Sequence, residues 1–243
     1  MPQFIFMTIT FIVSLILTFS SYFIKINGLS ALDITNRFPV MVTPINLSYV
    51  IWIVIYVLLG YWLVMNFKIR ATKSTLSAQQ MVLFGVVNIL QMFFIIARHQ
   101  QQFAVALAIL ALLLLCLFTL YNTYSLSNNA MIGRMPISIY FAWSTFLFIT
   151  NISFTLTSYE WDGLGLSNPL WAVILLTLGT AIALHIRFHH FDIAYPIVFI
   201  WSYIGIALHN GFDELLVTTA SLFLCGVMIV GIFFIKKNPA YQK

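Results

Sequence analysis

Two apolar stretches of the chain place large aromatic side chains at helical spacing, and these rings are its best candidates for binding chemistry. In the first stretch, from Pro39 to Gly60, Trp52, Tyr56 and Gly60 recur at i, i+4 and i+8. Side chains at that spacing lie on one face of a helix. Such rings either fill space between helices or form the wall of an apolar pocket. The residue types alone leave both interpretations open.

A second stripe of this kind lies between residues 137 and 158. Its members are three, four and four residues apart: Tyr140, Trp143, Leu147 and Asn151. In the intervening sequence, Asn88 and Gln91 are three residues apart and share a helix face. Amides in an apolar helix either make an interhelical hydrogen bond, of about 1 kcal/mol, or contact a ligand. The chain thus has two aromatic stripes and two stripes that carry amides.

Histidines gather near the end of another apolar stretch, in the segment HIRFHHFD. His185 and His189 are four residues apart, and His190 and Asp192 follow. Imidazoles at i and i+4 can bind a metal or a haem iron. No third ligand is fixed by the spacing, and a solvated turn beside Arg187 explains the same residues. The histidines are therefore weak metal candidates only, and Asp192 is expected at the start of the next helix, where a carboxylate suits the helix dipole.

The familiar sequence patterns of soluble enzymes do not occur. The chain contains no C-x-x-C, Walker A, G-x-G-x-x-G, G-x-S-x-G or H-E-x-x-H string. No spaced pair of acid and base side chains stands out either. Cys116 and Cys225 both fall in apolar stretches, where a thiol behaves as a small hydrophobe. The residues therefore favour a non-enzymatic role.

Composition indicates the kind of elements that position these residues. Of the 243 residues, 62% are hydrophobic and 7% are charged, which is typical of a polytopic membrane protein. We expect an all-α membrane bundle, because apolar runs near 20 residues cross a bilayer as helices. Eight such runs occur, at 4–23, 45–66, 81–97, 103–121, 137–158, 169–185, 191–209 and 216–235. The loop from Lys25 to Thr43 is long enough to cover the outer mouth of the bundle, as a lid or as a passive connector.

Charge placement predicts the orientation of the eight spans. One side of the membrane would carry eight cations: Lys68, Arg70, Lys73, Arg134, Arg187, Lys236, Lys237 and Lys243. The other side would carry three: Lys25, Arg37 and Arg98. Since Lys and Arg accumulate on the cytoplasmic side, both termini are predicted to be cytoplasmic. The net charge of +5 suits contact with lipid headgroups, and nothing resembles a nucleic-acid-binding module.

Three motifs make the chain resemble the TspO family, the translocator or tryptophan-rich sensory proteins. The second span resembles the family's signature helix through Pro39, Pro44, Trp52, Tyr56 and Gly60. The third resembles a helix that ends Phe-Phe-x-x-Ala-Arg, through Asn88 and residues 93–98, and the fifth resembles another through Tyr140, Trp143 and Asn151. The chain departs from the family's pattern at Met41, Thr43, Gln91 and Ile139.

The resemblance covers about residues 1–158, a five-helix unit, and residues 159–243 would form a three-helix extension like that of larger bacterial members. It implies a receptor or sensor that binds a planar hydrophobic ligand, tetrapyrrole- or sterol-like, in an aromatic-lined pocket within the bundle. Porphyrin or haem is a candidate ligand, and no cofactor is assigned. The residues expected to bind the ligand are Trp52, Tyr56, Asn88, Gln91, Tyr140, Trp143 and Asn151.

Other functions stay open on the sequence. The chain could be a transporter of a small hydrophobic molecule, because eight spans are enough for one. The charged residues within spans that usually mark ion coupling are, however, nearly absent. The chain could also be a regulatory subunit that binds another membrane protein through the three-helix extension. Its partner could instead be a second copy of the chain, in a homodimer. We expect a multi-pass protein of a bacterial cytoplasmic membrane, in contact with the lipid bilayer and a hydrophobic small molecule but with no nucleic acid.

Overall fold

The computed structural model describes residues 2–38, 40–69, 76–125 and 129–235, and in these residues it contains helices and no strand. The longer helices are α1 Pro2–Phe23, α3 Ile51–Ile69, α4 Ala78–His99, α5 Phe103–Asn122, α6 Met135–Ser158, α7 Asn168–His190, α8 Ala194–Asn210 and α9 Leu215–Phe234. The short ones are α2 Ala31–Thr35 and the 3-10 turns η1 Asn46–Val50 and η2 Gly163–Gly165. The predicted all-α class is confirmed.

Seven helical segments within the described ranges are long and apolar enough to cross a membrane. They correspond to predicted spans one to six and span eight, with η1 and α3 together forming one 24-residue segment. The remaining predicted span, 191–209, coincides with α8, which has 17 residues and a length of about 26 Å. The count of eight spans and the side on which the termini lie stay predictions.

Six of the residues named in the sequence analysis lie outside the described ranges. These are Pro39 of the signature helix and five of the eight predicted cytoplasmic cations, Arg70, Lys73, Lys236, Lys237 and Lys243. The remaining cations of that set, Lys68, Arg134 and Arg187, lie at or near the ends of α3, α6 and α7.

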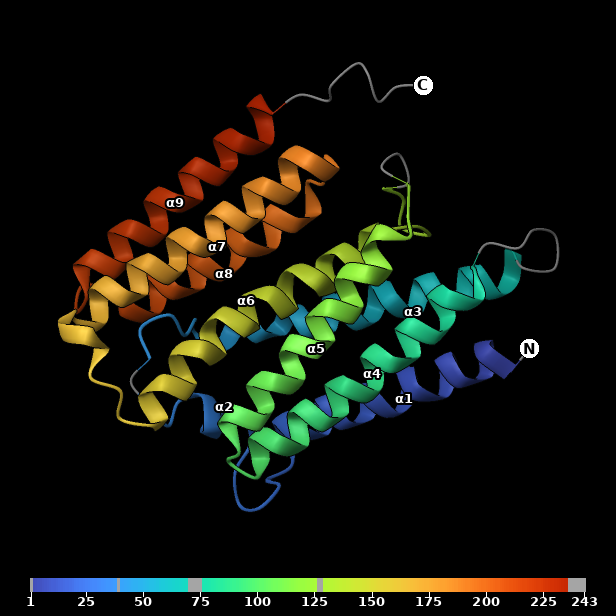
Figure 1. Ribbon diagram of the computed structural model, residues 1–243, viewed down its shortest axis with the longest axis horizontal. Coiled ribbons are helices and arrows are strands. Elements are labelled where there is room, and N and C mark those ends of the chain that lie inside the picture. The colour runs from blue at the N-terminus through green and yellow to red at the C-terminus, as the bar shows by residue number, and fades with distance from the viewer. Residues whose placement is uncertain (1, 39, 70–75, 126–128, 236–243) are drawn as a thin grey trace.

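The central helix is α6, which packs against α3, α5, α7 and α8. Buried residues occur all round it, and they include the small polar residues Ser138, Ser144 and Thr145. A helix buried on every side must sit inside the bundle, and small polar residues let neighbouring helices approach it closely. Figure 1 shows α7, α8 and α9 together on one side of α6, with α1, α4 and α5 on the other.

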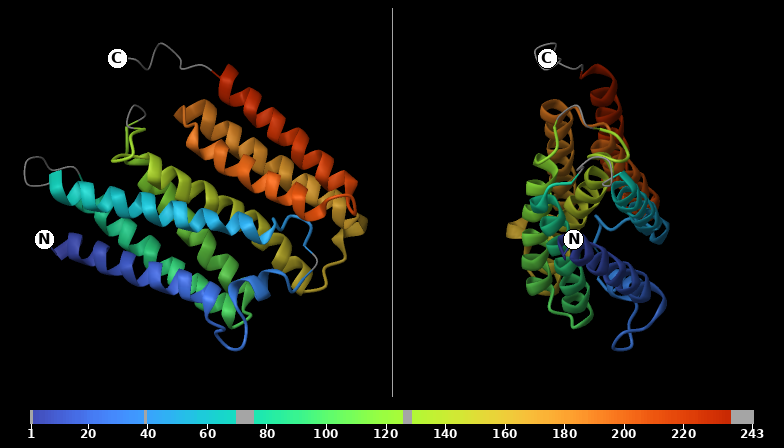
Figure 2. Two further views of the ribbon diagram at one scale, coloured as in Figure 1. Left: turned by 180° about the vertical axis from the view of Figure 1, so that it is seen from behind. Right: turned by 90° about the vertical axis from the view of Figure 1, so that its right-hand side faces the viewer.

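The end of the bundle that carries α2 is called the outer end and the opposite end the inner end, following the predicted orientation. At the outer end, the segment that leads into α3 meets α8. Because Gly205 has no side chain, its carbonyl oxygen can accept a hydrogen bond from the Ile45 amide at 3.1 Å. The Trp201 indole donates to the Ser48 carbonyl at 3.0 Å beside it. Below these contacts α3, α6 and α8 enclose a cleft of about 460 Å³, so α3 and α8 separate toward the inner end. Figure 2 shows the two groups of helices from behind and from the side.

Candidate functional site

Aromatic rings from α3 and α6 meet in the interior of the bundle. The Trp52 ring lies 6.0 Å from Tyr140 and 6.3 Å from Trp143, measured between ring centroids, and both pairs are edge-to-face. Tyr49 of η1 also meets Trp143 edge-on, at 5.7 Å. The Trp52 side chain is 4% exposed and Trp143 is fully buried. Edge-to-face contacts suit the ring quadrupoles, so the two stripes interlock rather than splay toward lipid.

Tyr56 fixes the orientation of this aromatic cluster relative to α1. Its hydroxyl lies 2.7 Å from Thr18 Oγ1 and 3.1 Å from Ser14 Oγ, and its ring packs 5.8 Å from Trp52. A buried hydroxyl needs such partners because no water is available to it in a membrane interior. Gly60, one turn further along the same face, is filled by Phe11 of α1. The space that the missing side chain of Gly60 leaves beside the rings is therefore occupied by Phe11.

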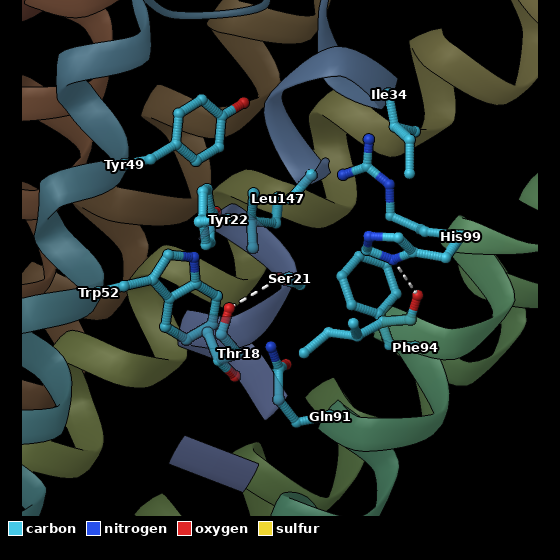
Figure 3. A pocket seen from close by; sticks show the side chains of 13 residues that line it. Thr18, Ser21, Tyr22, Ile34, Tyr49, Trp52, Gln91, Phe94, His99 and Leu147 are labelled. Atoms are coloured by element: carbon cyan, nitrogen blue, oxygen red, sulfur yellow. Dashed lines mark hydrogen bonds between the residues drawn. The ribbon is translucent and has the colours of Figure 1, made fainter. Parts of the chain in front are cut away.

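The enclosed space lies on the other side of Trp52, between α1, α2, α3 and α4. Its volume is about 30 Å³, enough for a water molecule. Figure 3 shows its aromatic walls, formed by Tyr22, Tyr49, Trp52 and Phe94, with Gln91 toward one end and His99 and Ile34 toward the other. Gln91 and Arg98 are seven residues apart on α4, so the cavity extends about 10 Å along the helix axis.

The three amides that were expected to contact one ligand do not all face the cavity. Gln91 lines the cavity, and its Oε1 accepts a hydrogen bond from the Tyr140 hydroxyl at 3.4 Å. Asn88 donates to the Phe84 carbonyl of its own helix at 2.9 Å, and Asn151 does the same to Leu147 at 2.7 Å. Of the predicted ligand residues, Trp52 and Gln91 thus reach the cavity directly. Tyr140, Trp143 and Tyr56 stand behind Trp52 and hold it.

Two residues at the outer end of the cavity were not predicted as site residues. The guanidinium of Arg98 lies 5.2 Å from the Phe154 ring centroid and donates to Thr35 Oγ1 at 3.3 Å. His99 is 4% exposed, and its Nδ1 lies 2.9 Å from the Ile95 carbonyl. Arg98 shares a heptad-spaced stripe with Gln91, which was the available sequence signal. Its place at the end of a span made it look like an ordinary boundary cation.

Helix α2 covers the outer end of the cavity and lies in the predicted loop from Lys25 to Thr43. Ile34 lines the cavity and is 1% exposed, whereas its neighbour Thr35 lines a second pocket on the outer side. That second pocket has a volume of about 520 Å³ and is bordered by polar groups that include Asn36, Asn46 and His209. One turn of helix therefore separates the small aromatic cavity from a larger pocket bordered by polar groups.

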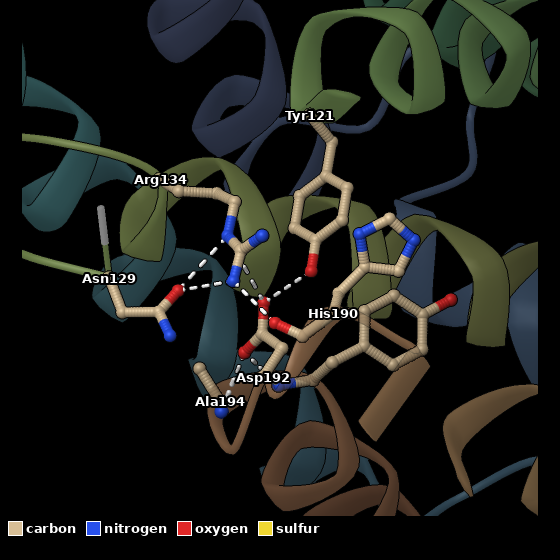
Figure 4. Close-up of polar contacts among 7 residues, drawn as sticks. Tyr121, Asn129, Arg134, His190, Asp192 and Ala194 are labelled. Carbon is tan, nitrogen blue, oxygen red and sulfur yellow. Dashed lines mark hydrogen bonds and ion pairs between the residues drawn. The ribbon is translucent and has the colours of Figure 1, made fainter. Parts of the chain in front are cut away.

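A separate polar cluster closes the inner end of the bundle, as Figure 4 shows. The buried Arg134 Nε lies 4.0 Å from Asp192 Oδ2, and Arg134 Nη2 donates to the His190 carbonyl at 2.8 Å. Tyr121 donates its hydroxyl proton to Asp192 Oδ2 at 2.7 Å. Asp192 Oδ1 accepts the Ala194 amide at 2.9 Å, which confirms the predicted place of this carboxylate at a helix N-terminus.

The three candidate metal histidines do not converge in the structure. The rings of His185 and His189 pack 4.3 Å apart on α7, whereas His190 packs against Tyr121 at 5.1 Å. Over the part of the chain that the structure describes, no group of three His, Cys, Asp or Glu side chains could hold a metal ion. The polar contacts of His190 belong to the cluster around Arg134 and Asp192.

Comparison with known proteins assigns the chain to a family. A family model described as "TSPO-like protein" matches residues 4–234. The match covers the three C-terminal helices as well as the five long helices before them, so the division of the chain near residue 158 stays a prediction. Neither a search of curated proteins nor a search of solved structures found a match. Since the family model spans nearly the whole chain, this multi-pass membrane protein belongs to the TSPO-like family.

Proposed function

We propose that this protein is a membrane receptor for a planar hydrophobic ligand, such as a tetrapyrrole, which binds against Trp52 in the cavity beneath α2. The observation that carries the proposal is the composition of the cavity wall: three aromatic rings from α1, η1 and α3 face a fourth from α4. Flat apolar molecules gain both area burial and ring stacking in such a space. Membership of the TSPO-like family supports the same assignment.

The ligand needs more room than the closed cavity offers. Sites for small molecules have volumes of about 300–1,000 Å³, whereas this cavity has about 30 Å³. Helix α2 is the element best placed to move, because it has five residues and borders both the cavity and the outer pocket. Its side-chain links to neighbouring elements include the 3.3 Å bond from Arg98 to Thr35 and a 3.2 Å bond from Asn36 to Asn46. Opening at α2 would join the two pockets and admit the ligand from the outer side.

The residues behind Trp52 would act as support rather than as ligand contacts. Tyr140 and Trp143 restrict the Trp52 ring from α6, and Tyr56 restricts it from the next turn of its own helix. A ring held on several sides loses little conformational freedom when a ligand stacks on it, which favours binding. Replacing Trp52 should therefore weaken binding more than replacing Trp143.

Binding of protoporphyrin IX to the detergent-solubilised protein, followed by quenching of tryptophan fluorescence, tests the proposal. The wild type should bind saturably, Trp52→Ala should lose at least about tenfold in affinity, and Trp143→Ala should lose less. An aromatic pair contributes about 0.5–1.5 kcal/mol beyond its area burial, and about 1.4 kcal/mol corresponds to tenfold in affinity. Trp161→Phe in the outer loop also removes one indole, so it controls for the change in signal. Equal affinity in the wild type and both alanine variants would refute this pocket.

We extend the proposal to eight spans with both termini on the cytoplasmic side. Support comes from the course of the chain, since α8 returns along α7 and α9 and all three pack together. Helix α1 begins at the same end of the bundle at which α9 finishes (Figure 1), as an even number of crossings requires. A span of 17 residues is close to the hydrocarbon thickness of about 30 Å, and a few ångströms of mismatch cost little.

A further inference from the structure

We infer that Arg98 and His99 form an anion-binding end of the aromatic cavity, so that the ligand carries a carboxylate or a similar anionic group on its flat apolar body. The inference rests on the proposed function and specifies the class of ligand. Both residues line the outer end of the cavity, beside the rings of Tyr22 and Phe94.

Arg98 has no acidic partner. The chain contains six Asp and Glu residues, all within the described ranges, and none of them lies within 4.0 Å of the Arg98 guanidinium. Its contacts in that part of the chain are the Thr35 hydroxyl, at 3.3 Å, and the rings of Phe94 and Phe154, at 5.9 and 5.2 Å. Hydroxyl and ring contacts do not neutralise a charge, and a cation that is partly desolvated without an opposite charge beside it is costly.

Two buried arginines among the described residues show what a compensated guanidinium looks like in this protein, whereas the Arg98 side chain is half-buried. Arg134 has Asp192 beside it, with the Asn129 side chain and the His190 carbonyl as acceptors. Arg187 donates to the carbonyls of Ile232 and Ile235, at 2.9 and 2.6 Å. Those carbonyls lie at the C-terminal end of α9, where the helix dipole is negative. Arg98 lies in the last turn of α4, where the helix dipole favours a cation, but among the described residues neither a carboxylate nor a backbone carbonyl accepts from it, so its charge is available to a ligand.

Unpaired donors and acceptors point to the same place. The Nε of Arg98 and the Nε2 of His99 are buried, and neither has a hydrogen-bond partner among the described residues. His99 is bonded at its other ring nitrogen to the Ile95 carbonyl, which requires a proton on Nδ1. Arg134 Nη1 and Arg187 Nε are also buried without a partner, so what distinguishes Arg98 and His99 is their place on the cavity wall. A buried polar atom without a partner forfeits the hydrogen bonds it had in water, and a polar ligand in the cavity would restore them. A carboxylate seated at the outer end would accept from the Arg98 guanidinium, with His99 Nε2 beside it.

The resulting site is polar at one end and apolar along its length. A carboxylate at Arg98 would leave the ligand's flat body against Trp52 and its far edge near Gln91, about 10 Å deeper along α4. Arginine suits this role because its planar fork matches a carboxylate with two parallel hydrogen bonds. The Thr35 link from α2 ends on the same guanidinium, so an arriving anion would compete with the covering helix for Arg98.

Two probes with one macrocycle test the inference on the full-length protein in detergent. Protoporphyrin IX has two carboxylates, and its dimethyl ester has none. The wild type should bind the dicarboxylate at least about tenfold more tightly than the ester, as expected for one charge-assisted hydrogen-bonded pair. Arg98→Gln should bring the two affinities within about twofold of each other, whatever the loss of the Thr35 link does to both. Arg98→Lys should restore part of the preference, whereas Arg37→Gln, which removes an exposed cation on the same side, should not change it.

The outcomes separate this inference from the proposed function. Equal binding of both probes by the wild type would overturn the anion site and leave the planar-ligand receptor standing. An undiminished preference in a folded Arg98→Gln protein would also overturn it. Failure of both probes to bind would refute the receptor proposal and the anion site with it. Should Arg98→Gln not fold, the wild-type ratio of the two affinities still decides.

Discussion

The hydroxyl of Tyr56 shows how a single polar atom can join two helices in lipid. It lies within hydrogen-bonding distance of Ser14 and Thr18 on α1, and its ring packs against Trp52. Interhelical hydrogen bonds in membranes average well under 2 kcal/mol, because the freed partners find other acceptors. Here Thr18 and Ser14 could turn to the carbonyls of their own helix.

Tyr56→Phe should therefore lower the free energy of unfolding by about 1 kcal/mol without changing the packing of the ring. Thermal unfolding in detergent, followed by circular dichroism, measures the loss. Tyr61→Phe removes a hydroxyl from the exposed side of the same helix and should have no measurable effect. A loss in Tyr61→Phe as large as that in Tyr56→Phe would mean that the bonds to α1 are not the cause.

Residue periodicity predicted the aromatic contacts better than the roles of the amides. Trp52, Tyr140 and Trp143 meet as the two stripes suggested, because large rings on facing helices can hardly avoid one another. Asn88 and Asn151 instead bond to carbonyls four residues earlier in their own helices. Helical spacing cannot distinguish that local bond from a contact to a ligand, since both place the amide on the same face.

Helix α2 is the element whose role the sequence left most open, as lid or connector. A capping box begins it: the Ser30 hydroxyl accepts the Asp33 amide, and the Asp33 carboxylate accepts the Ser30 amide at 2.9 Å. The hydrogen bonds from Ser30 hold the pKa of the Asp33 carboxyl below its usual range. A depressed pKa in the folded state means that the cap stabilises α2 above the ordinary pKa of about 3.9 and is lost as the pH falls through the lower value.

Asp33→Asn should reproduce that acidic state at neutral pH. We expect several-fold faster amide hydrogen exchange across α2, because the carboxylate no longer caps the helix or matches its dipole. Exchange in α4 and α6 should not change. Asp213→Asn neutralises another outer-side acid and serves as the control. Unaltered exchange in α2 would show that the capping box does not limit its opening.

Element boundaries were predictable where the apolar runs were long, and less so where packing decides. Helix α8 begins after the turn at Asp192 and ends at Asn210, with Gly211 as its C-cap. It is therefore shorter than the predicted span 191–209. The 3-10 turn η1 extends α3 at the outer end, because Ser48 and Trp201 join there. Tertiary contacts of this kind are not visible in a hydropathy pattern.

At the scale of the whole molecule, α7–α9 are joined to the preceding helices at both ends. The inner junction is the buried pair of Arg134 and Asp192. At the outer junction, Asn210 donates to the Met41 carbonyl at 2.9 Å, and Gly205 accepts from the Ile45 amide at 3.1 Å. The outer pocket lies at this junction, so α8 contributes His209 to the mouth of the proposed site. This arrangement makes α8 part of the wall of the outer pocket.

Gly205 provides the close approach on which the outer junction depends. A Cβ added there would lie 2.9 Å from Pro44 Cβ and closer still to Ser48 Oγ, on the segment that leads into α3. Gly205→Ala should therefore force α8 away from η1 and cost about 1–3 kcal/mol, as overpacking does. Gly226→Ala on α9 is the matched control, because nothing lies within 4 Å of its added Cβ and alanine favours a helix.

Thermal unfolding of the two variants, with porphyrin affinity measured on each, connects this junction to the site. Gly205→Ala should unfold at a lower temperature than the wild type and bind protoporphyrin IX with altered affinity, because η1 carries Tyr49 of the cavity wall. Gly226→Ala should match or exceed the wild type in stability and leave binding unchanged. If Gly205→Ala is destabilised while its affinity stays at the wild-type value, the C-terminal helices support the fold but do not shape the cavity.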